Sequence, residues 1–453
     1  MNVNSNSEYG ARPRIWFAVY QLLWHLLLPL AFVRLAWRAR HSFAYLHHIP
    51  ERLGFGYDKP ITQGSIWIHA VSVGETRAAQ PLIEAYLARG ESILLTHMTL
   101  NGRRTGKQLF AKVIATGQIR QVYLPYDLCW SVENFLKTFK PKLGLFMETE
   151  AWPTVVFRCA QIGLPLFLVN ARLSERSARR VQQFGKAGHA LFQAFSGILA
   201  QTEFDAQRYR SLGVQNVQIV GNLKFDVPLD QSLVQQGKVW RQDLHASKRM
   251  MVCAASTRDG EEVIILKVWK DLLLSNTFEI APLLCLVPRH PERFTEVADQ
   301  IHASGFKFRR RTEWSGVLKE TAGIEIVLGD SMGEMPMYYS ASDLVVMGGS
   351  LLPFGGQNLI EACAAGCPVL LGEHTYNFQQ AALDAIQIGA AKRIEGDLLL
   401  GEPVALMEAL KALLLNTAEL AKMREAAKAY SVEHQGATQR ILVALDEQNF
   451  SIA

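Results

Sequence analysis

Residues 343–373 read DLVVMGGSLLPFGGQNLIEACAAGCPVLLGE and compress two apolar strands and one helix around several glycines. The runs 344–347 and 368–371 are short and wholly apolar, as parallel strands covered on both faces are. Residues 359–365 between them carry a helical apolar face, with Asn358 at the N-cap position. A strand, a helix and a second strand in this order predict a parallel α/β sheet.

Four glycines precede this helix: Gly348, Gly349, Gly355 and Gly356. Glycine lets the backbone approach a ligand closely, and a helix start offers free N–H groups and the positive end of a dipole. The stretch therefore predicts an anion site, where Glu361 one turn further could accept hydrogen bonds from ribose hydroxyls. The alternative is that these glycines only mark turns.

The same alternation of strands and helices extends over the chain in two series. Strands are predicted at 66–70, 93–96, 122–125, 143–147, 166–169, 198–201 and 217–220, and then at 251–255, 283–287, 306–309, 325–328, 344–347 and 369–371. The polar stretch between the series predicts a linker. We therefore expect an anchor segment (1–45), two doubly wound Rossmann-like domains (46–225 and 250–453) facing a cleft, and a linker (226–249). Ligands of such sheets bind beyond the carboxyl ends of the strands.

The chain has 453 residues, of which 49% are hydrophobic, enough for two or three domains with large cores. Its 47 basic and 42 acidic residues leave a net charge of +5. This diffuse excess does not indicate nucleic acid, although it suits anionic lipid headgroups or anionic substrates. The six cysteines are scattered through apolar patterns, so we predict reduced core residues.

An apolar stretch, IWFAVYQLLWHLLLPLAFV, fills residues 15–33 and is about the minimum length that crosses a bilayer. Gln21, His25 and Pro29 interrupt it, so it either spans the membrane or only dips into it, and a buried core helix is the alternative. Three arginines follow without a small-residue cleavage site, which predicts a retained anchor with its basic side toward the cytoplasm.

Acidic residues follow two predicted strands of the first series. Glu75 opens a helix after the first strand, where it could serve as a general base or could merely complement the helix dipole. Glu148 and Glu150 end the fourth strand two positions apart and so point to the same side. Together these residues predict a carboxylate cluster, and Lys224 in GNLKFD adds a cation just before the linker.

In the second series, the strand at 283–287 runs into Pro288, Arg289 and His290. A fixed turn, a guanidinium and an imidazole at a strand end predict a phosphate contact. Met332, Gly333 and Glu334 are expected to begin a helix after the strand at 325–328. The sequence has no Walker motif, no HExxH and no Asp-x-Asp pair, so we expect no metal.

Nine blocks of this sequence together resemble the Kdo transferases, which attach 3-deoxy-D-manno-octulosonic acid (Kdo) from CMP-Kdo to the lipid A precursor. In chain order the blocks are HAVSVGE, METEAWP, NARLSERS, GNLKFD, PRHPER, MGEM, GGS, GGQNLIEA and HTYNF. The resemblance covers nearly the whole chain, including the anchor. It implies a GT-B fold, an inverting transfer to lipid IVA in lipopolysaccharide biosynthesis without metal or cofactor, and a place on the cytoplasmic face of the bacterial inner membrane.

The resemblance also implies roles for individual residues. Glu75 would be the general base, and Glu148 or Glu150 would assist the transition state together with Lys224. The CMP site would be lined by Pro288, Arg289, Met332, Gly333, Glu334, Asn358, Leu359, Ile360 and Glu361, with His290 beside them.

Two other functions remain open from the sequence. One is a different GT-B transferase or an epimerase that uses a nucleoside diphosphate sugar. The other is a membrane-anchored protein that binds nucleotide sugars without catalysis. A mere binder has no need of a base at Glu75, so mutation of that residue distinguishes the last alternative from an enzyme.

Overall fold

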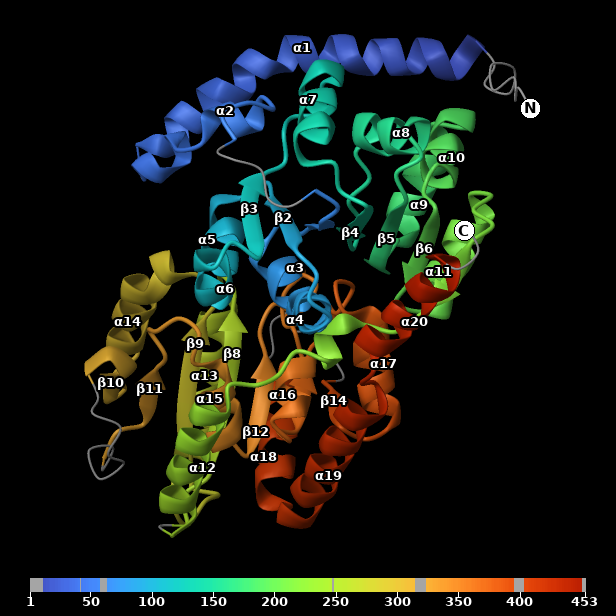
Figure 1. Cartoon of the computed structure of the whole chain (residues 1–453). Helices are drawn as coiled ribbons and strands as arrows, with labels where there is room; N and C mark the ends of the chain where they lie inside the picture. Colours follow the sequence, from blue (N-terminus) through green and yellow to red (C-terminus); the bar gives the residue numbers. More distant parts are fainter. Residues whose placement is uncertain are drawn as a thin grey trace. The chain divides into compact units, whose positions relative to one another are not determined.

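The computed structural model describes residues 11–40, 42–57, 63–246, 248–313, 323–394 and 403–449 (Figure 1). The chain forms two compact units. The first unit comprises Met1–Val227 together with Gln435–Ala453, and the second comprises Pro228–His434. Residues 1–10 of the polar N-terminal segment lie outside the described residues, while residues 11–14 already belong to the first helix.

The first unit is built on a seven-stranded sheet in the order β3-β2-β1-β4-β5-β6-β7. All of its strand pairs are parallel. The strands are β1 (Ile66–His69), β2 (Ile93–His97), β3 (Ile119–Tyr123), β4 (Leu143–Met147), β5 (Leu166–Ala171), β6 (Gly197–Ala200) and β7 (Val217–Ile219). The chain leaves the central strand β1 toward β2 and returns beside it as β4, so the strand order reverses between β1 and β4.

Helices cover both faces of this sheet because successive strand side chains point to opposite sides. On one face, the buried Trp67 packs against Phe135 and Phe146, with ring centroids 5.0 and 4.9 Å away. That face carries α7 (Cys129–Phe139), α8 (Pro153–Gln161), α9 (Glu175–Gln183), α10 (Lys186–Gln193) and α11 (Glu203–Ser211). The other face carries α3 (Val73–Ala78), α4 (Gln80–Ala88) and the C-terminal α20 (Ala437–Asn449). The remaining elements of this unit are η1 (Phe43–Leu46), α2 (Ile49–Arg52), α5 (Leu100–Leu109), α6 (Ala111–Ala115) and η2 (Leu223–Phe225).

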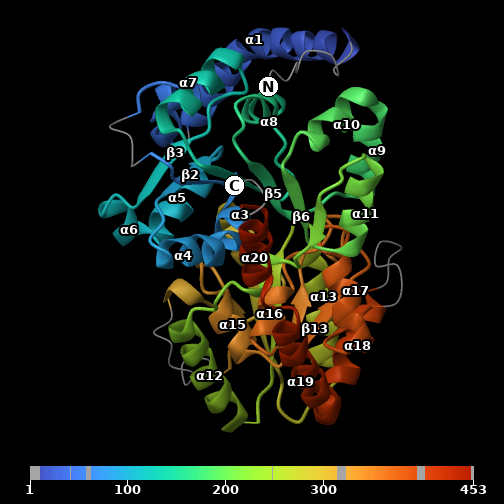
Figure 2. The same ribbon diagram turned by 45° about the vertical axis from the view of Figure 1, so that its right-hand side comes forward.

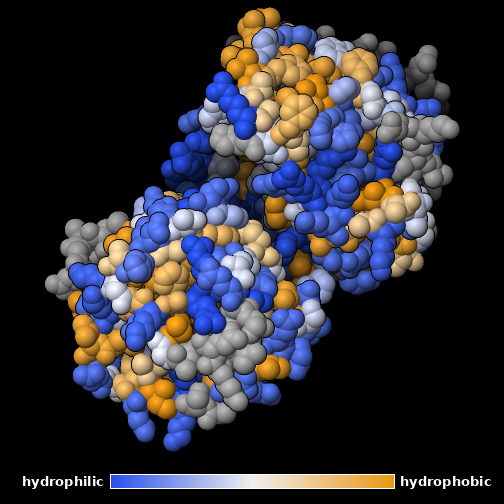
Figure 3. Space-filling view, turned by 90° about the vertical axis from the view of Figure 1, so that its left-hand side faces the viewer, coloured by the Kyte–Doolittle hydropathy of each residue, from blue (hydrophilic) through white to orange (hydrophobic). Residues whose placement is uncertain are grey.

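The apolar N-terminal stretch forms α1 (Ala11–Ala39), which lies against the first unit near α7 (Figure 1). Within the described part of the chain it is the one helix long and apolar enough to cross a membrane, with a mean hydropathy of 1.6 over its candidate span. Its outer side exposes Leu22, Leu23, Leu26, Leu27, Leu30 and Val33. Figure 3 shows hydrophobic side chains gathered at the top of the first unit, where this helix runs.

Two polar residues of α1, Tyr20 and Gln21, face the protein, whereas His25 is exposed. Tyr20 donates from its hydroxyl to Asp127 Oδ2 at 2.8 Å. Gln21 donates from Nε2 to Thr154 Oγ1 at 2.7 Å and accepts from the Cys129 amide at 3.0 Å. Gln21 was expected to interrupt the apolar stretch. In the structure its side chain instead points to the protein and joins α1 to α7 and α8.

The second unit repeats the architecture with a seven-stranded parallel sheet in the order β10-β11-β9-β8-β12-β13-β14. The strands are β8 (Met251–Thr257), β9 (Leu283–Pro288), β10 (Phe308–Arg310), β11 (Ile326–Leu328), β12 (Leu344–Met347), β13 (Val369–Leu371) and β14 (Ala391–Arg393). Its helices are α12 (Gln231–Ala246), α13 (Glu261–Leu274), α14 (Phe294–Ala303), α15 (Met335–Ala341), α16 (Ile360–Ala364), α17 (Gln379–Gln387), α18 (Val404–Leu415) and α19 (Thr417–Glu433), with the short turns η3 (Pro291–Arg293) and η4 (Arg311–Glu313). Here the strand order reverses between β8 and β12.

The structure divides the chain differently from the sequence expectation at two places. The stretch predicted as a linker contains α12, whose Trp240 and Leu244 are buried and whose Arg241 pairs with Asp343 of the second unit. The stretch is polar overall but amphipathic, so it forms a packed helix. At the other end, α20 contacts α4 and η2 and belongs to the first unit, as can be followed in Figure 2.

Candidate functional site

The carboxylates of the first unit come together at the carboxyl ends of β1 and β4. These two strands are neighbours, with Ile68 opposite Leu145 and His69 opposite Phe146. Glu75 follows β1 in the first turn of α3, and the two glutamates of METE follow β4. The predicted cluster therefore exists, at the point where the strand order of the sheet reverses.

Glu75 is held by a capping box at the start of α3. Ser72 is the N-cap, and its Oγ accepts from the Glu75 amide at 3.3 Å and donates to Glu75 Oε1 at 3.1 Å. The Val71 amide donates to Glu75 Oε2 at 2.6 Å. The pKa of Glu75 is raised to about 7, mainly by burial; the hydrogen bond from Val71 opposes this rise, and the negative charges of Glu148 and Glu150 add to it. The residue thus takes part in a helix cap and has a pKa near neutral pH.

Glu148 lies in a strained backbone conformation and pairs with the predicted cation. Its φ of 55° falls in the left-handed region, which is costly for a residue with a Cβ. Lys224 Nζ lies 2.7 Å from Glu148 Oε1, and both side chains are 18% exposed. Asn170 accepts the Leu223 amide at 2.9 Å and so fixes the η2 turn that carries Lys224.

Two ring side chains, those of Trp152 and His69, lie beside Glu150. The Trp152 indole donates to Glu150 Oε2 at 2.8 Å, and the Trp152 ring lies 6.4 Å from that of Trp24 in α1. Nε2 of the fully buried His69 lies 4.0 Å from the same carboxylate oxygen. Burial raises the pKa of Glu150 and lowers that of His69 to about 3, so this imidazole is neutral. Sequence reasoning missed Trp152 and His69, although both lie within the two quoted motifs.

In the second unit, the carboxyl ends of β8 and β9 place basic residues side by side. Thr257 and Pro288 are direct partners across the two strands, so the next residues, Arg258 and Arg289, are neighbours. The Arg289 amide donates to the Thr257 carbonyl at 3.0 Å. His290 Nε2 lies 2.8 Å from Arg258 Nη1. Burial and the adjacent guanidinium groups lower the pKa of His290.

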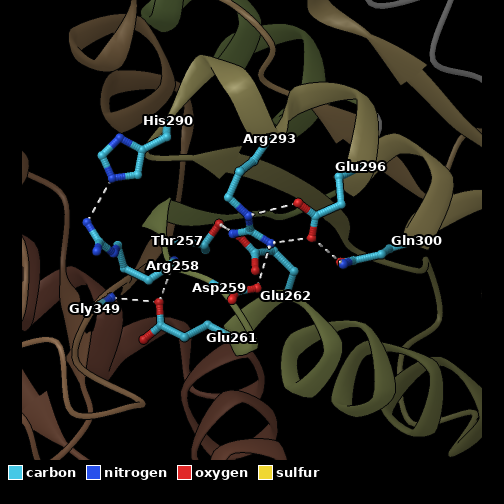
Figure 4. A network of polar contacts seen from close by, with 10 residues as sticks. All are labelled: Thr257, Arg258, Asp259, Glu261, Glu262, His290, Arg293, Glu296, Gln300 and Gly349. Carbon is cyan, nitrogen blue, oxygen red and sulfur yellow. Dashed lines mark hydrogen bonds and ion pairs between the residues drawn. The ribbon is translucent and has the colours of Figure 1, made fainter. Parts of the chain in front are cut away.

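Two buried glutamates at the start of α13 organise this strand end (Figure 4). Glu261 accepts from four backbone amides, those of Arg258, Gly349, Leu351 and Leu352, at 2.7 to 3.3 Å. It therefore ties the loop after β8 to the loop after β12. Glu262 accepts from Thr257 Oγ1 and from Arg293, both at 2.7 Å. Neither glutamate was predicted, although their place right after a strand in TRDGEE was the available signal.

The glycines after β12 serve the fold of the loop itself. A Cβ on Gly348 would lie 2.4 Å from the Ser256 carbonyl oxygen, and one on Gly355 would collide with Tyr376 and Asn377. Gly355 also has a φ of 93°, which favours glycine. The turn-and-packing alternative therefore accounts for these two positions, and close approach of a ligand is not needed to explain them.

The structure moves the two predicted helix starts by one and three residues. Asn358 accepts from the Ile360 amide at 3.2 Å, while the N-cap of α16 is Leu359 and the helix has only five residues. Glu361 lies in its first turn. Likewise α15 begins at Met335, after Met332 and Gly333, and its N-cap Glu334 binds Arg311 at 2.9 Å. Such short helices contribute less dipole than a long helix would.

The cysteines and the possible metal ligands were compared with the sequence expectation. All six cysteines are unpaired, and five of them are buried. Within the residue ranges given above, no group of three His, Cys, Asp or Glu side chains is placed to hold a metal ion.

Comparison with known proteins identifies the family. Residues 47–227 match the family model described as 3-deoxy-D-manno-octulosonic-acid transferase (Kdo transferase). The 3-deoxy-D-manno-octulosonic acid transferase of Bordetella pertussis is 42% identical over 95% of this chain and 98% of its own length. The chain belongs to the Kdo transferase family. The transferase of the same name from Haemophilus influenzae is 34% identical over 94% of this chain and 97% of its own.

Family membership makes the protein a glycosyltransferase of lipopolysaccharide biosynthesis. Among solved structures, the UDP-GlcNAc 2-epimerase of Neisseria meningitidis, bound to UDP-GlcNAc, has a TM-score of 0.55 and covers 84% of this chain and 100% of its own. At 15% identity this likeness concerns the fold alone. Together with the two parallel sheets it confirms the GT-B fold expected for a Kdo transferase.

Proposed function

We propose that the chain transfers Kdo from CMP-Kdo to the lipid A precursor lipid IVA by an inverting, metal-independent displacement with Glu75 as general base. The observation that carries this proposal is the Glu75 carboxyl group at the end of β1, with its pKa raised to about 7. A group with a pKa near the working pH is unprotonated in a large fraction of molecules and still basic enough to take a proton.

Glu75 takes the proton from an acceptor hydroxyl while that oxygen attacks the anomeric carbon of Kdo. A single displacement of CMP inverts the configuration at that carbon and needs only one base. The hydrogen bonds from Val71 and Ser72 hold the carboxylate oxygens at the strand end, which limits the rotation lost when the acceptor binds.

Lys224 and the METE glutamates assist the transition state. The Lys224 ammonium, fixed 2.7 Å from Glu148, is a partly buried cation that offsets negative charge developing on the leaving group. Glu148 in turn orients this lysine through the same ion pair. Glu150 acts on the base through its charge, because it adds to the elevated pKa of Glu75.

The second unit supplies the groups that bind the donor. Arg289 takes the single phosphate of CMP, and Glu361 accepts hydrogen bonds from the ribose. The segments Met332–Glu334 and Asn358–Glu361 line the nucleotide. Since CMP carries one phosphate, guanidinium and ammonium groups offset its charge without a divalent cation.

Helix α1 holds the protein at the cytoplasmic face of the bacterial inner membrane. Its exposed leucines enter the lipid boundary, while Tyr20 and Gln21 keep the opposite side on the protein. A helix held in this way lies along the membrane surface, so the acceptor can keep its acyl chains in the bilayer while its sugar headgroup is modified.

Incubation of the full chain with CMP-Kdo and lipid IVA in mixed micelles, followed by mass spectrometry, tests the proposal. We expect the acceptor mass to rise by whole Kdo residues and CMP to appear. Parallel calorimetry with CMP and UDP tests the alternative favoured by the shared fold with an epimerase. Binding of UDP but not CMP, with no mass change in lipid IVA, would overturn the proposed donor.

A further inference from the structure

The arginines at the carboxyl edge of the second sheet divide into two groups. Arg293 pairs with Glu262, Glu296 and Asp259, and Arg311 pairs with Glu334. Arg310 pairs with Asp330. By contrast, neither Arg258 nor Arg289 lies within ion-pair distance of a carboxylate in the described residues. Two arginines whose backbones are neighbours therefore have no carboxylate partner at this edge among the described residues.

Arg258 is held rigidly even though no acid neutralises it. Glu261 Oε2 accepts its backbone amide at 2.8 Å and the Gly349 amide at 2.7 Å, which fixes the start of the side chain (Figure 4). The guanidinium carbon lies 4.8 Å from the ring centroid of Phe354, in the loop after β12. This stacking directs the group by cation–π attraction.

The contact with His290 shows which ligands Arg258 can still accept. Arg258 Nη1 donates to Nε2 of His290 at 2.8 Å, so this nitrogen presents its lone pair and the imidazole is neutral. A guanidinium has five N–H donors, and this bond uses one of them. In the described part of the structure the other N–H groups of Arg258 have no protein partner. They suit a planar, bidentate anion such as a carboxylate.

The group transferred by this family is itself such an anion. Kdo is a 2-ulosonic acid, so its carboxylate is bonded to the same anomeric carbon that carries the phosphate in CMP-Kdo. Two negative groups on one carbon require two positive groups close together. Adjacent parallel strands are about 4.8 Å apart, and Arg258 and Arg289 directly follow paired residues on such strands.

We propose that Arg258 binds the carboxylate of Kdo while Arg289 binds the phosphate of CMP. Arg258 thereby selects a donor whose sugar is an acid, because a neutral sugar would leave the remaining N–H groups of this guanidinium without an anionic partner. The inference rests on the proposed function in placing the donor on the second unit. It goes further by assigning the transferred sugar its own subsite.

The test compares ligands with and without the carboxylate. For wild type, Arg258→Ala and Arg258→Lys, the Kd of CMP is measured by calorimetry and the KM and kcat of CMP-Kdo in the transfer reaction. We expect CMP to bind all three within twofold. The KM of CMP-Kdo should rise roughly 10- to 150-fold in Arg258→Ala, the range for one charge-assisted hydrogen-bonding group, with partial recovery in Arg258→Lys.

A donor analogue with the carboxylate reduced to a hydroxymethyl group provides the matching control. Wild type should lose affinity for this analogue by the same factor, whereas Arg258→Ala should not distinguish it from CMP-Kdo. Equal losses for CMP and CMP-Kdo in Arg258→Ala, or no loss for either, would overturn the inference. If wild type fails to bind CMP at all, the proposed function fails instead, so the two outcomes are distinguishable.

Discussion

Replacing Glu75 by glutamine separates the two roles that the structure gives this residue. Glutamine keeps a carbonyl oxygen for the Val71 amide and an amide group for Ser72 Oγ, so it can cap α3, but it cannot take a proton. We expect the free energy of unfolding of Glu75→Gln to lie within about 1 kcal/mol of the wild-type value, because a helix cap usually contributes about that much. Its kcat should fall by roughly 10² to 10⁴, the usual worth of a general base.

The pKa of Glu75 also fixes the pH dependence of the rate. The base acts when unprotonated, and burial together with the two METE glutamates raises its pKa to about 7. A group with this pKa is unprotonated in roughly nine molecules of ten at pH 8 and in about one of thirty at pH 5.5, so the rate should fall roughly 30-fold between these values. The residual rate of Glu75→Gln should stay flat over the same range.

Initial rates of Kdo transfer to lipid IVA, read by mass spectrometry from pH 5.5 to 8, measure both effects. Thermal unfolding of the same proteins, measured at pH 5.5 and at pH 8, shows whether they stay folded over this range, and recovery of the rate on return to pH 8 excludes irreversible inactivation. Glu75→Ala serves as the comparison variant, since it loses the capping contacts as well as the base. The reasoning is refuted if Glu75→Gln keeps its rate within tenfold of wild type while Glu75→Ala is destabilised, because Glu75 would then only cap the helix.

Three further results are expected. Transfer should survive excess EDTA, because protein cations offset the single phosphate of CMP, and a strict magnesium or manganese requirement would contradict this. Arg289→Ala should weaken the binding of CMP but not of cytidine, whereas Glu361→Ala should weaken the binding of both, each by roughly 1.5 to 3 kcal/mol. If calorimetric titrations show that the two variants lose equal affinity for cytidine, the phosphate and ribose ends are misassigned. Glu150→Gln removes a like charge near Glu75, so the acid limb of the pH–rate profile should move to lower pH; an unmoved limb would show that the two carboxylates do not interact.

The strands could be read from the sequence wherever both faces of the sheet are covered. Leu143–Met147, Leu344–Met347 and Val369–Leu371 were predicted to the residue because their apolar runs are continuous. The edge strand Ala391–Arg393 was missed, since one of its side chains is exposed and its residues show no such run. The helix at Gln231–Ala246 was taken for a linker because its apolar face is sparse.

The acidic cluster of the first unit was predictable for a topological reason, whereas the hydrogen-bond partners of buried carboxylates were not. Parallel strands end at one edge, so residues after β1 and β4 had to meet there. The partners of Glu261, by contrast, come from a loop about ninety residues further along the chain. Burial of a carboxylate depends on such distant backbone amides, and no local pattern reports them. The packing role of Gly348 could not be predicted for the same reason, since the groups that crowd it come from another strand.

The docking of α1 has a practical consequence for anyone who shortens the chain to obtain a more tractable protein. Removing the first forty residues would strip the buried Asp127 of the Tyr20 hydroxyl and the Cys129 amide of its Gln21 acceptor. It would also bare Trp152, whose indole holds Glu150. The turnover of a shortened chain would therefore reflect the loss of these contacts around Glu150 as well as the loss of the apolar helix itself.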